Sequence, residues 1–465
     1  MSGIFGAITK DRDCAETVFY GTDYLSHLGT EFGGMAIMGE EIVRRIRDIS
    51  QTQFKSKFYD DWKVMHGSKG IGVISSKEEQ PICINSKLGS FALCTNGLIE
   101  NSRELTERLL KKGVSFSEVL DGTVNPTELI AKIINEGSSI ISGIEKVFKS
   151  IEGSCSLLVL NQDGIYAARD RFGYTTLVIA RRNNDWAVTS ETSSLPNLDF
   201  KIVKYLQPGE IVLINDDGIK ELRSGGKKNQ ICAFLWIYTG FPASSYEGIN
   251  VEAVRERCGR CLARRDTIKA DMASGVPDSG ITHAIGYAME SKLPYRRPLV
   301  KYTPGYGRSY TPPSQATRDK VAKMKLIPIK DIIAGNRIIM CDDSIVRGTQ
   351  LKNFTIQKLH ENNAREIHIR ISCPPLMFPC RYNLSTRNID ELAARRAIRA
   401  LEGKHAKDVS EYIDHTSKKY KKMVDWIKKD LGVDSLRYQI IDDMIGAIGL
   451  PKSSLCLYCW TGKGL

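Results

Sequence analysis

The chain has 465 residues, more than one ordinary hydrophobic core organises, so two domains of average size are expected. Hydrophobic residues make up 42% and charged residues 26%, which excludes an intrinsically disordered chain. No apolar run approaches the roughly 20 residues that a membrane span needs. The N-terminal residues Met1–Gly6 lack the pattern of a secretory signal, so a cytoplasmic protein is expected.

The first half of the sequence predicts many short strands with a few helices between them. Strands are expected at 34–38, 156–160, 176–180 and 210–214, and helices at 102–112 and 127–135. This mixture indicates an α+β layered domain. The polar, glycine- and lysine-rich stretch 224–229 is typical of a boundary, which gives domains at 1–228 and 229–465.

The second half changes to repeated strand–loop–helix units. Strands are expected at 268–276, 337–341 and 367–371, with helices after 280 and at 351–361. The first of these helices has an apolar stripe at the spacing of a core-facing helix, made of Ile281, Ala284, Ile285, Ala288 and Met289. Such units predict an α/β domain with a parallel sheet and a ligand at the carboxyl ends of its strands.

The net charge of +12 gathers late in the chain, in helix-like sequence. Basic runs of this kind are usually solvated helix faces, and no aromatic-rich recognition motif accompanies them. The charge therefore fits anionic small substrates and disfavours a nucleic-acid partner. The basic helical region 404–429 is either surface decoration or a docking face.

The segment Ile338–Gln350 is the most informative in the chain. An apolar strand ends in two adjacent carboxylates, Asp342 and Asp343, and a loop containing Ser344, Gly348 and Thr349 then opens a helix. The loop amides suit a phosphate dianion, and the carboxylates suit ribose hydroxyls and Mg²⁺. The alternative is an ordinary turn with a capping aspartate.

This segment resembles the phosphoribosylpyrophosphate (PRPP) signature of type I phosphoribosyltransferases, in the form found in the glutamine PRPP amidotransferase family. The likeness covers most of the chain, and Gly275–Ser279 resembles the family's pyrophosphate loop. It implies an N-terminal Ntn-hydrolase-like domain with four αββα layers, followed by a type I phosphoribosyltransferase domain. The segment Lys301–Arg308 departs from the family's flexible loop.

The resemblance also implies the residues of the transferase site. The PRPP-binding set is Asp342, Asp343, Ser344, Arg347, Gly348, Thr349 and Arg318, and Mg²⁺ is associated with Ser279, Asp342 and Asp343. Arg347 keeps two interpretations, a phosphate contact or a solvent-facing loop residue. The implied reaction is loss of pyrophosphate and capture of the ribosyl centre by a nitrogen nucleophile.

The glutaminase half departs from the family at several positions. Ser2 stands where the family has its nucleophilic cysteine, and Leu28 replaces an arginine. The family's Ser-Asp-Thr-Glu stretch reads Asn-Pro-Thr-Glu at 125–128, which removes the carboxylate that would hold the α-ammonium group of glutamine. The stretch 70–76 lacks the family's arginine, while the oxyanion-hole dipeptide Asn96-Gly97 is kept. Because a hydroxyl is a poorer nucleophile than a thiol, these losses predict a domain that does not hydrolyse glutamine.

The resemblance extends to cysteines that hold a [4Fe–4S] cluster in one branch of the family. By residue they are Cys232, Cys380, Cys456 and Cys459. A zinc site formed by Cys258, Cys261, Cys456 and Cys459 is the alternative, together with no metal at all. A cluster would tie the C-terminal tail to the domain junction.

Three functions follow from these observations. The first is an amidophosphoribosyltransferase that makes 5-phosphoribosylamine for purine biosynthesis from PRPP and ammonia, free or delivered by a partner protein docked on the basic region. The second transfers the ribosyl group to another nucleophile, and the third only binds PRPP. The resemblance also implies a homo-oligomer.

Overall fold

The computed structural model describes residues 2–120, 122–302, 325–383, 388–404 and 406–464. The chain divides into two compact units, the first made of residues 1–232, 243–247 and 381–384 and the second of the remainder. The main stretch of the first unit ends shortly after the polar segment 224–229. None of the described helices is long and apolar enough to cross a membrane.

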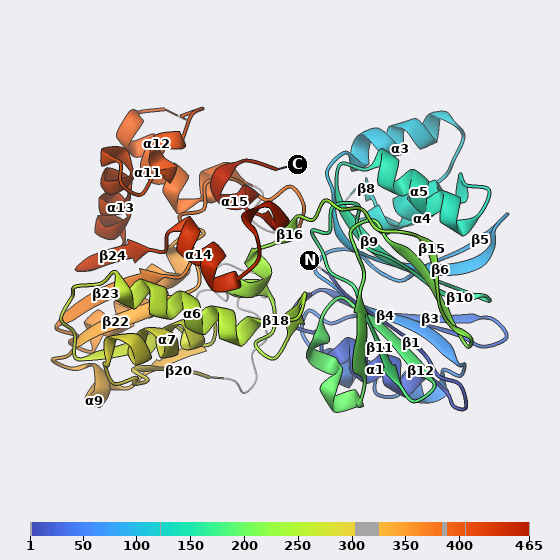
Figure 1. The fold of residues 1–465 in the computed structure, drawn as a ribbon, viewed down its shortest axis with the longest axis horizontal. Helices are drawn as coiled ribbons and strands as arrows, with labels where there is room; N and C mark the ends of the chain where they lie inside the picture. Colours follow the sequence, from blue (N-terminus) through green and yellow to red (C-terminus); the bar gives the residue numbers. More distant parts are fainter. Residues whose placement is uncertain (1, 121, 303–324, 384–387, 405, 465) are drawn as a thin grey trace. The chain divides into compact units, whose positions relative to one another are not determined.

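The first unit contains two antiparallel sheets (Figure 1). The seven-stranded sheet has, from edge to edge, β13 (Lys201–Tyr205), β11 (Val178–Arg182), β12 (Asp185–Thr189), β1 (Gly3–Ile8), β4 (Lys69–Ser75), β2 (Phe32–Met38) and β3 (Ile42–Asp48). The six-stranded sheet has β15 (Gly218–Arg223), β14 (Ile211–Asn215), β10 (Gly164–Ala168), β9 (Gly153–Asn161), β6 (Gly89–Ile99) and β5 (Ile82–Ser86). The strands expected at 34–38, 156–160, 176–180 and 210–214 overlap β2, β9, β11 and β14.

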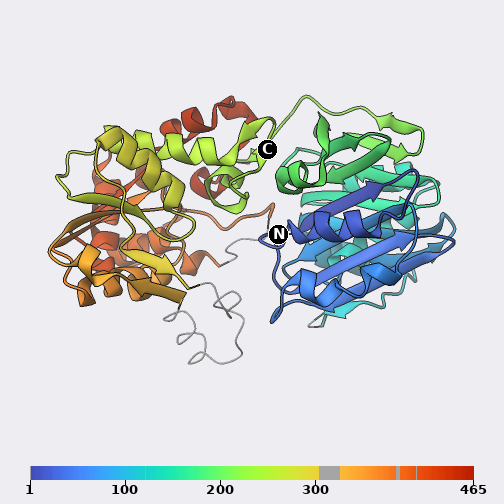
Figure 2. The same cartoon turned by 90° about the horizontal axis from the view of Figure 1, so that it is seen from below.

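Helices cover the outer face of each sheet. The seven-stranded sheet carries α1 (Ala15–Asp23) and α2 (Phe54–Phe58), and the six-stranded sheet carries α3 (Ser102–Lys111), α4 (Pro126–Asn135) and α5 (Ile140–Ser150). Figure 2 shows α1 lying across the strands of its sheet. Short elements complete the unit: β7 (Val119–Leu120), β8 (Thr123–Val124), β16 (Ile231–Cys232), β17 (Ser245–Tyr246) and the 3-10 turns Trp62–Val64, Thr192–Ser194 and Pro196–Leu198.

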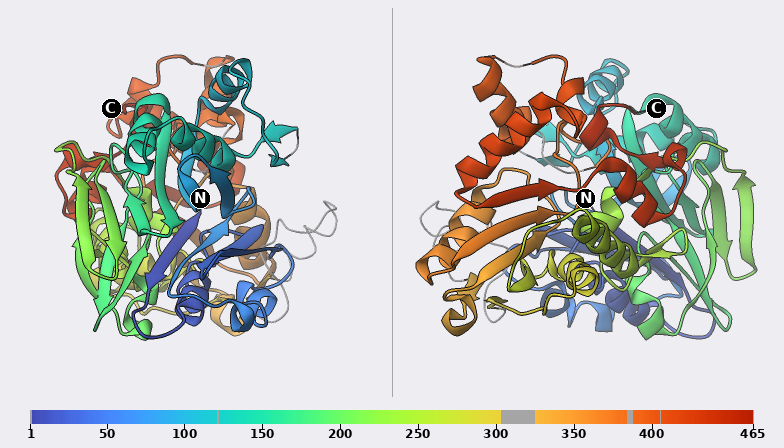
Figure 3. Two further views of the ribbon diagram at one scale, coloured as in Figure 1. Left: turned by 90° about the vertical axis from the view of Figure 1, so that its right-hand side faces the viewer. Right: turned by 60° about the vertical axis from the view of Figure 1, so that its left-hand side comes forward.

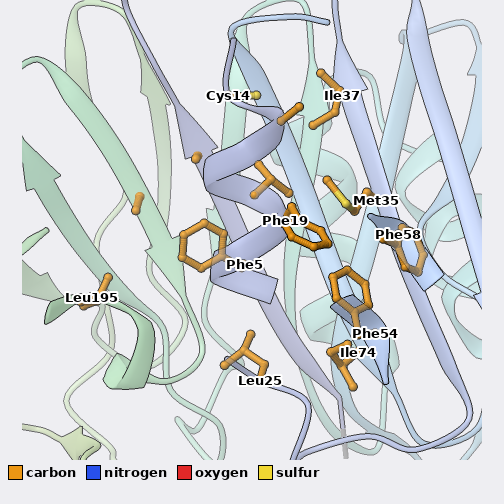
Figure 4. Packing of buried hydrophobic residues seen from close by; sticks show 14 of the residues in the cluster. Phe5, Cys14, Phe19, Leu25, Met35, Ile37, Phe54, Phe58, Ile74 and Leu195 are labelled. Atoms are coloured by element: carbon orange, nitrogen blue, oxygen red, sulfur yellow. The ribbon is translucent and has the colours of Figure 1, made fainter. Parts of the chain in front are cut away.

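Three hydrophobic clusters lie between the four layers of helices and sheets. One lies between the two sheets, a second between the six-stranded sheet and α3–α5, and a third beneath α1 and α2. In the third, shown in Figure 4, Phe19 stacks on Phe54 with ring centroids 5.8 Å apart, and Phe54 stacks on Phe58 at 4.3 Å. The αββα architecture predicted for this half is confirmed.

The second unit is built on a parallel sheet with the order β19 (Met272–Gly275), β22 (Arg337–Asp342), β23 (Glu366–Ile371) and β24 (Ser435–Tyr438). One face carries α6 (Val251–Arg264) and α7 (Ile281–Ser291), which Figure 3 shows beside the strands, and α14 (Ile441–Ile448) lies against α6. The remaining helices are α9 (Lys330–Ile333), α10 (Gln357–Glu361), α11 (Ala393–Glu402), α12 (Ser410–Ile413), α13 (Lys418–Leu431) and α15 (Tyr458–Thr461). The predicted α/β parallel-sheet domain is confirmed.

Short segments connect this framework. They are the strands β18 (Ile249–Asn250), β20 (Leu299–Lys301), β21 (Leu326–Pro328) and β25 (Leu455–Cys456), the π-helical turns η4 (Leu235–Thr239) and η5 (Leu351–Ile356), and the 3-10 turns η6 (Ile389–Glu391) and η7 (Lys452–Ser454). The strands β20 and β21 pair antiparallel outside the main sheet. The region 404–429 contributes α12 and most of α13.

Two glycines let α6 and α7 approach each other closely. A Cβ atom at Gly259 would lie 1.9 Å from the carbonyl oxygen of His283, and one at Gly286 would lie 2.0 Å from that of Glu256. This contact decides which face of α7 is buried. Met289, expected on the core-facing stripe, is 55% exposed, whereas His283 and Tyr287 are buried.

Substitution of Gly259 by alanine is expected to lower the free energy of unfolding by about 3 kcal/mol, because the added methyl group forces the two helices apart. Gly446 in α14 is the matched control, since a Cβ there meets nothing within 4 Å. Gly446→Ala should be neutral or stabilise by about 0.5–1 kcal/mol. Denaturant unfolding followed by circular dichroism measures both variants, and equal stabilities would contradict the close approach.

Candidate functional site

Two tight backbone approaches form the site at the carboxyl ends of β19 and β22. The N–H of Val276 donates to the carbonyl oxygen of Cys341 at 2.9 Å, so the loop after β19 lies on the end of β22. A Cβ atom at Gly280 would lie 2.2 Å from the same carbonyl oxygen, and one at Gly275 would lie 2.3 Å from the Gly280 oxygen. Only glycine fits these two positions, and the loop is thereby held where Ser279 reaches β22.

The two loops meet through side chains that carry the predicted Mg²⁺ chemistry. Ser279 Oγ donates to Asp342 Oδ1 at 2.9 Å, and the N–H of Asp343 donates to the same oxygen at 3.0 Å. Ser344 Oγ donates to Asp343 Oδ2 at 2.6 Å. The structure therefore gathers four residues of the predicted set, Ser279 and Asp342–Ser344, at the end of the sheet.

Both carboxylates of this pair are buried. Burial raises the pKa of Asp342 well above its usual range, the adjacent Asp343 carboxylate raises it further, and the hydrogen bond from Ser279 opposes the shift. Among the described residues, no basic side chain pairs with either carboxylate, so the two acidic groups repel each other where both are ionised. The arrangement is suited to a cation or to hydroxyl donors, which relieve the repulsion.

The loop beyond the carboxylates turns into a helix at the predicted place. Gly348 has a φ of +80°, a left-handed conformation that favours glycine. Thr349 and Gln350 are already helical, and the N–H of Lys352 donates to the Gly348 carbonyl oxygen at 2.9 Å. Ser344 and Gly348 thus lie on one continuous loop and Thr349 begins the helix after it, the form that a phosphate-binding turn takes.

The side chain of Arg347 is exposed to solvent and also forms an ion pair. Its Nη2 lies 2.6 Å from Glu391 Oε2, and its side chain is 62% exposed. Glu391 could not be predicted as its partner, because the two residues are 44 positions apart. Arg318 and most of the segment Lys301–Arg308 lie outside the described residues; Lys301 itself pairs with Asp278 Oδ2 at 2.5 Å.

The predicted nucleophile position and oxyanion-hole dipeptide meet in the first unit. The backbone nitrogen of Ser2 donates to Asn96 Oδ1 at 3.2 Å, and both residues are buried. Gly97 follows on β6 with a φ of +151°, and a Cβ there would lie 2.1 Å from the Ser154 carbonyl oxygen. The backbone around Ser2, Asn96 and Gly97 therefore allows glycine alone at position 97.

Apolar side chains pack against Gly3, the residue after Ser2. Leu28 is only 7% exposed and belongs to the same core cluster as Phe5 and Leu25. Its Cδ1 atom would lie 3.0 Å from a Cβ at Gly3. The stretch 70–76 forms β4, in which Val73 and Ile74 are buried in the cores on opposite faces of the sheet. The guanidinium groups of the resembling family have no counterpart at these positions.

The polar residues of the Asn-Pro-Thr-Glu stretch support local structure. Asn125 caps α4, with Oδ1 accepting from the N–H of Thr127 at 2.9 Å. The buried carboxylate of Glu128 accepts from the N–H and Oγ of Ser117 at 3.0 and 3.1 Å and from the N–H of Glu118 at 2.8 Å. These hydrogen bonds tie the segment before β7 to the helix.

Three of the four predicted cluster cysteines lie in neighbouring segments of the second unit. The N–H groups of Met377 and Phe378 donate to the carbonyl oxygen of Cys459 at 2.9 and 3.0 Å, which brings the segment of Cys380 against Cys456 and Cys459. Cys232 ends β16 in the first unit. Within the described ranges, no group of three or more His, Cys, Asp or Glu side chains is arranged to hold a metal ion.

Known proteins resemble the chain over its whole length. The family described as "Glutamine amidotransferase domain" matches residues 68–197. Amidophosphoribosyltransferase of Methanocaldococcus jannaschii is 31% identical over 100% of this chain and 97% of its own, and that of Bacillus subtilis is 30% identical over 99% and 93%.

Solved structures agree with the sequence comparisons. The glutamine PRPP amidotransferase of B. subtilis, complexed with ADP and GMP, is 29% identical, with a TM-score of 0.84 over 99% of this chain and 96% of its own. A structure described as the allosteric regulatory enzyme of purine biosynthesis has a TM-score of 0.85 at 29% identity, over 99% of this chain and 95% of its own. The chain therefore belongs to the amidophosphoribosyltransferase family of pentosyltransferase enzymes, with an Ntn glutamine-amidotransferase domain followed by a phosphoribosyltransferase domain.

Proposed function

We propose that the chain transfers the phosphoribosyl group of Mg-PRPP to ammonia, forming 5-phosphoribosylamine and pyrophosphate as a step of purine nucleotide biosynthesis. The observation that carries this proposal is the meeting of Ser279, Asp342 and Asp343 at the carboxyl ends of two parallel strands. Family membership supports the reaction type.

Different residues of the site bind different parts of the substrate. The loop 344–349 takes the 5-phosphate through its amides, and the Asp342–Asp343 pair takes the ribose hydroxyls. The loop containing Ser279 takes the pyrophosphate. Bound Mg²⁺ supplies charge stabilisation on the leaving group, and Ser279, Asp342 and Asp343 are the side chains that would hold it or its waters. The protein's own contribution is to position the reactants and to exclude water from the ribosyl centre.

Ammonia, and not glutamine, is the proposed nitrogen source. In support, Ser2 replaces the nucleophilic thiol, and Leu28 fills core space beside Gly3. Asn125 and Glu128 are engaged in the local hydrogen bonds of α4. The proposal includes a homo-oligomer and a partner protein that docks on the basic region 404–429 and supplies ammonia.

The proposed [4Fe–4S] cluster, held by Cys232, Cys380, Cys456 and Cys459, has a structural role. Its support is the chemistry of the donor set, four thiols, and the hydrogen bonds that place the Cys380 segment beside Cys459. Since the described thiols are not gathered into a metal-holding group, no step of the reaction is assigned to the cluster.

Purified under anaerobic conditions, the protein is expected to release pyrophosphate from PRPP with Mg²⁺ and ammonia, and not with glutamine. Asp342→Asn should lower kcat/KM about 100-fold or more, because the site loses a carboxylate that orients ribose and metal. Coupled pyrophosphate release measures both rates. Turnover with glutamine would refute the ammonia proposal, and binding of PRPP without turnover with any amine would identify a binding-only protein.

Ser2→Cys is expected to leave glutamine-dependent turnover at background, because a thiol restores the nucleophile without the side chains that grip the substrate. Ser2→Ala is the matched control, since it removes the hydroxyl from the same buried position. Glutamate release from glutamine is measured for both variants. Glutamate production by Ser2→Cys above that of Ser2→Ala would show that only the nucleophile is missing.

Anaerobically purified protein is expected to contain about four iron and four acid-labile sulfide atoms per chain. Cys456→Ser should lose both, whereas Cys261→Ser, which changes a half-buried cysteine of α6, should keep them. Metal analysis and sulfide determination read out the result. Zinc without sulfide, lost in both variants, would support the alternative site instead.

A further inference from the structure

We propose that Arg396 of α11 is a positioning residue that orients the phosphate loop, defined as residues 344–349. This inference rests on the proposed function and assigns a role to a residue of the basic, helix-like sequence late in the chain. Arg396 does not touch the substrate site; it acts through the backbone of the loop. The role of Arg396 follows from the contact of α11 with the carbonyl groups of the loop.

Helix α11 holds two consecutive carbonyl groups of the phosphate loop. The N–H of Ala393 donates to the Val346 carbonyl oxygen at 2.7 Å, and Arg396 Nη2 donates to the Arg347 carbonyl oxygen at 2.7 Å. Both carbonyl groups therefore point toward α11. One of these contacts is fixed by the helix backbone, whereas the other depends on a side chain and can be removed by substitution.

The geometry of the peptide bond then fixes the N–H groups. In a trans peptide the C=O of one residue and the N–H of the next point in opposite directions. The bonds from Val346 to Arg347 and from Arg347 to Gly348 are trans. The N–H groups of Arg347 and Gly348 consequently point away from α11, and neither donates to an acceptor among the described residues.

Two adjacent amides that face the same side form a small anion-binding concavity. Because both carbonyls are held on the α11 side, these amides are aimed before any ligand arrives. Gly348, with its positive φ, supports the same turn. The side chain of Arg347 pairs with Glu391 of η6, the turn that directly precedes α11.

Residues at the C-terminal end of α13 contact both Arg396 and the segment after the phosphate loop. Arg396 Nη2 also lies 3.9 Å from Asp430 Oδ2, and Lys352 Nζ lies 3.1 Å from Asp430 Oδ1. Leu431 Cδ2 would lie 3.6 Å from a Cβ at Gly348. Asp430 thus bridges Arg396 to the helix that follows the loop, so the guanidinium is held on two sides.

Loss of Arg396 is expected to affect binding of the 5-phosphate end of PRPP and not of its pyrophosphate end. Loss of the Arg396 hydrogen bond frees the Arg347–Gly348 peptide to rotate, which costs affinity for a 5-phosphate. The loop containing Ser279 is held by Cys341 and Asp342 and is independent of α11. A group bound equally in the ground and transition states changes KM and leaves kcat alone.

The test compares Arg396→Gln with Arg399→Gln in the full chain. Arg399 lies on the same helix and pairs with Asp390 at 3.1 Å, so both variants remove one positive charge from α11. Calorimetric titration with Mg²⁺ present measures Kd for two probes, ribose 5-phosphate and inorganic pyrophosphate. Arg396→Gln should weaken ribose 5-phosphate binding roughly five- to tenfold and change pyrophosphate binding less than about twofold.

Arg399→Gln should change neither Kd, and Arg396→Gln should raise KM for PRPP with little change in kcat. Arg396→Lys, which keeps a donor, should restore part of the affinity and guards against a folding defect. Equal affinities for ribose 5-phosphate in the two glutamine variants would overturn the inference, as would equal weakening of both probes. A wild-type chain that binds pyrophosphate and PRPP but shows no turnover refutes only the proposed reaction; one that binds neither refutes both.

Discussion

The transferase site depends on the contact between two strand ends. The loop after β19 rests on the last residues of β22 through the Val276–Cys341 hydrogen bond, and glycines at 275 and 280 leave no room for a side chain between them. Ser279 reaches Asp342 only because of this contact. The parallel register of β19 and β22, in which Gly275 lies opposite Cys341, sets the level at which the two loops emerge. The pairing of β19 with β22 therefore also determines the geometry of the site.

The buried polar groups of the transferase site and those of the Asn-Pro-Thr-Glu stretch differ in their hydrogen bonding. In the second unit, Asp342 and Asp343 are buried next to each other and no described basic side chain pairs with them, an arrangement that costs stability and that proteins keep where a ligand relieves it. In the first unit, buried polar groups such as Asn125 and Glu128 are satisfied within the fold. A carboxylate pair that repels itself is suited to a ligand, whereas Asn125 and Glu128 are satisfied by the hydrogen bonds of their own helix and the segment before it.

The sequence predicted best what is local along the chain. The strand, the two carboxylates and the loop of Ile338–Gln350 are contiguous, so their geometry follows from one βα turn. The layered first domain followed from strand and helix periodicity together with family resemblance. Contacts between distant segments were not predictable: Arg347 meets Glu391, and Met289 is exposed because Gly259 and Gly286 turn α7 against α6. Periodicity places an apolar stripe, but a close helix crossing decides which residues it covers.

The position of Leu28 has an evolutionary consequence. Its side chain shares a core cluster with Phe5 and Leu25, so an arginine here would place its guanidinium against apolar side chains. An unpaired buried charge costs several kcal/mol, comparable to much of the stability of a domain. A lineage that has acquired leucine here cannot return to arginine by that one substitution and still fold well. Reversal requires neighbouring residues to change first, so the packing of one side chain makes the history of this domain directional.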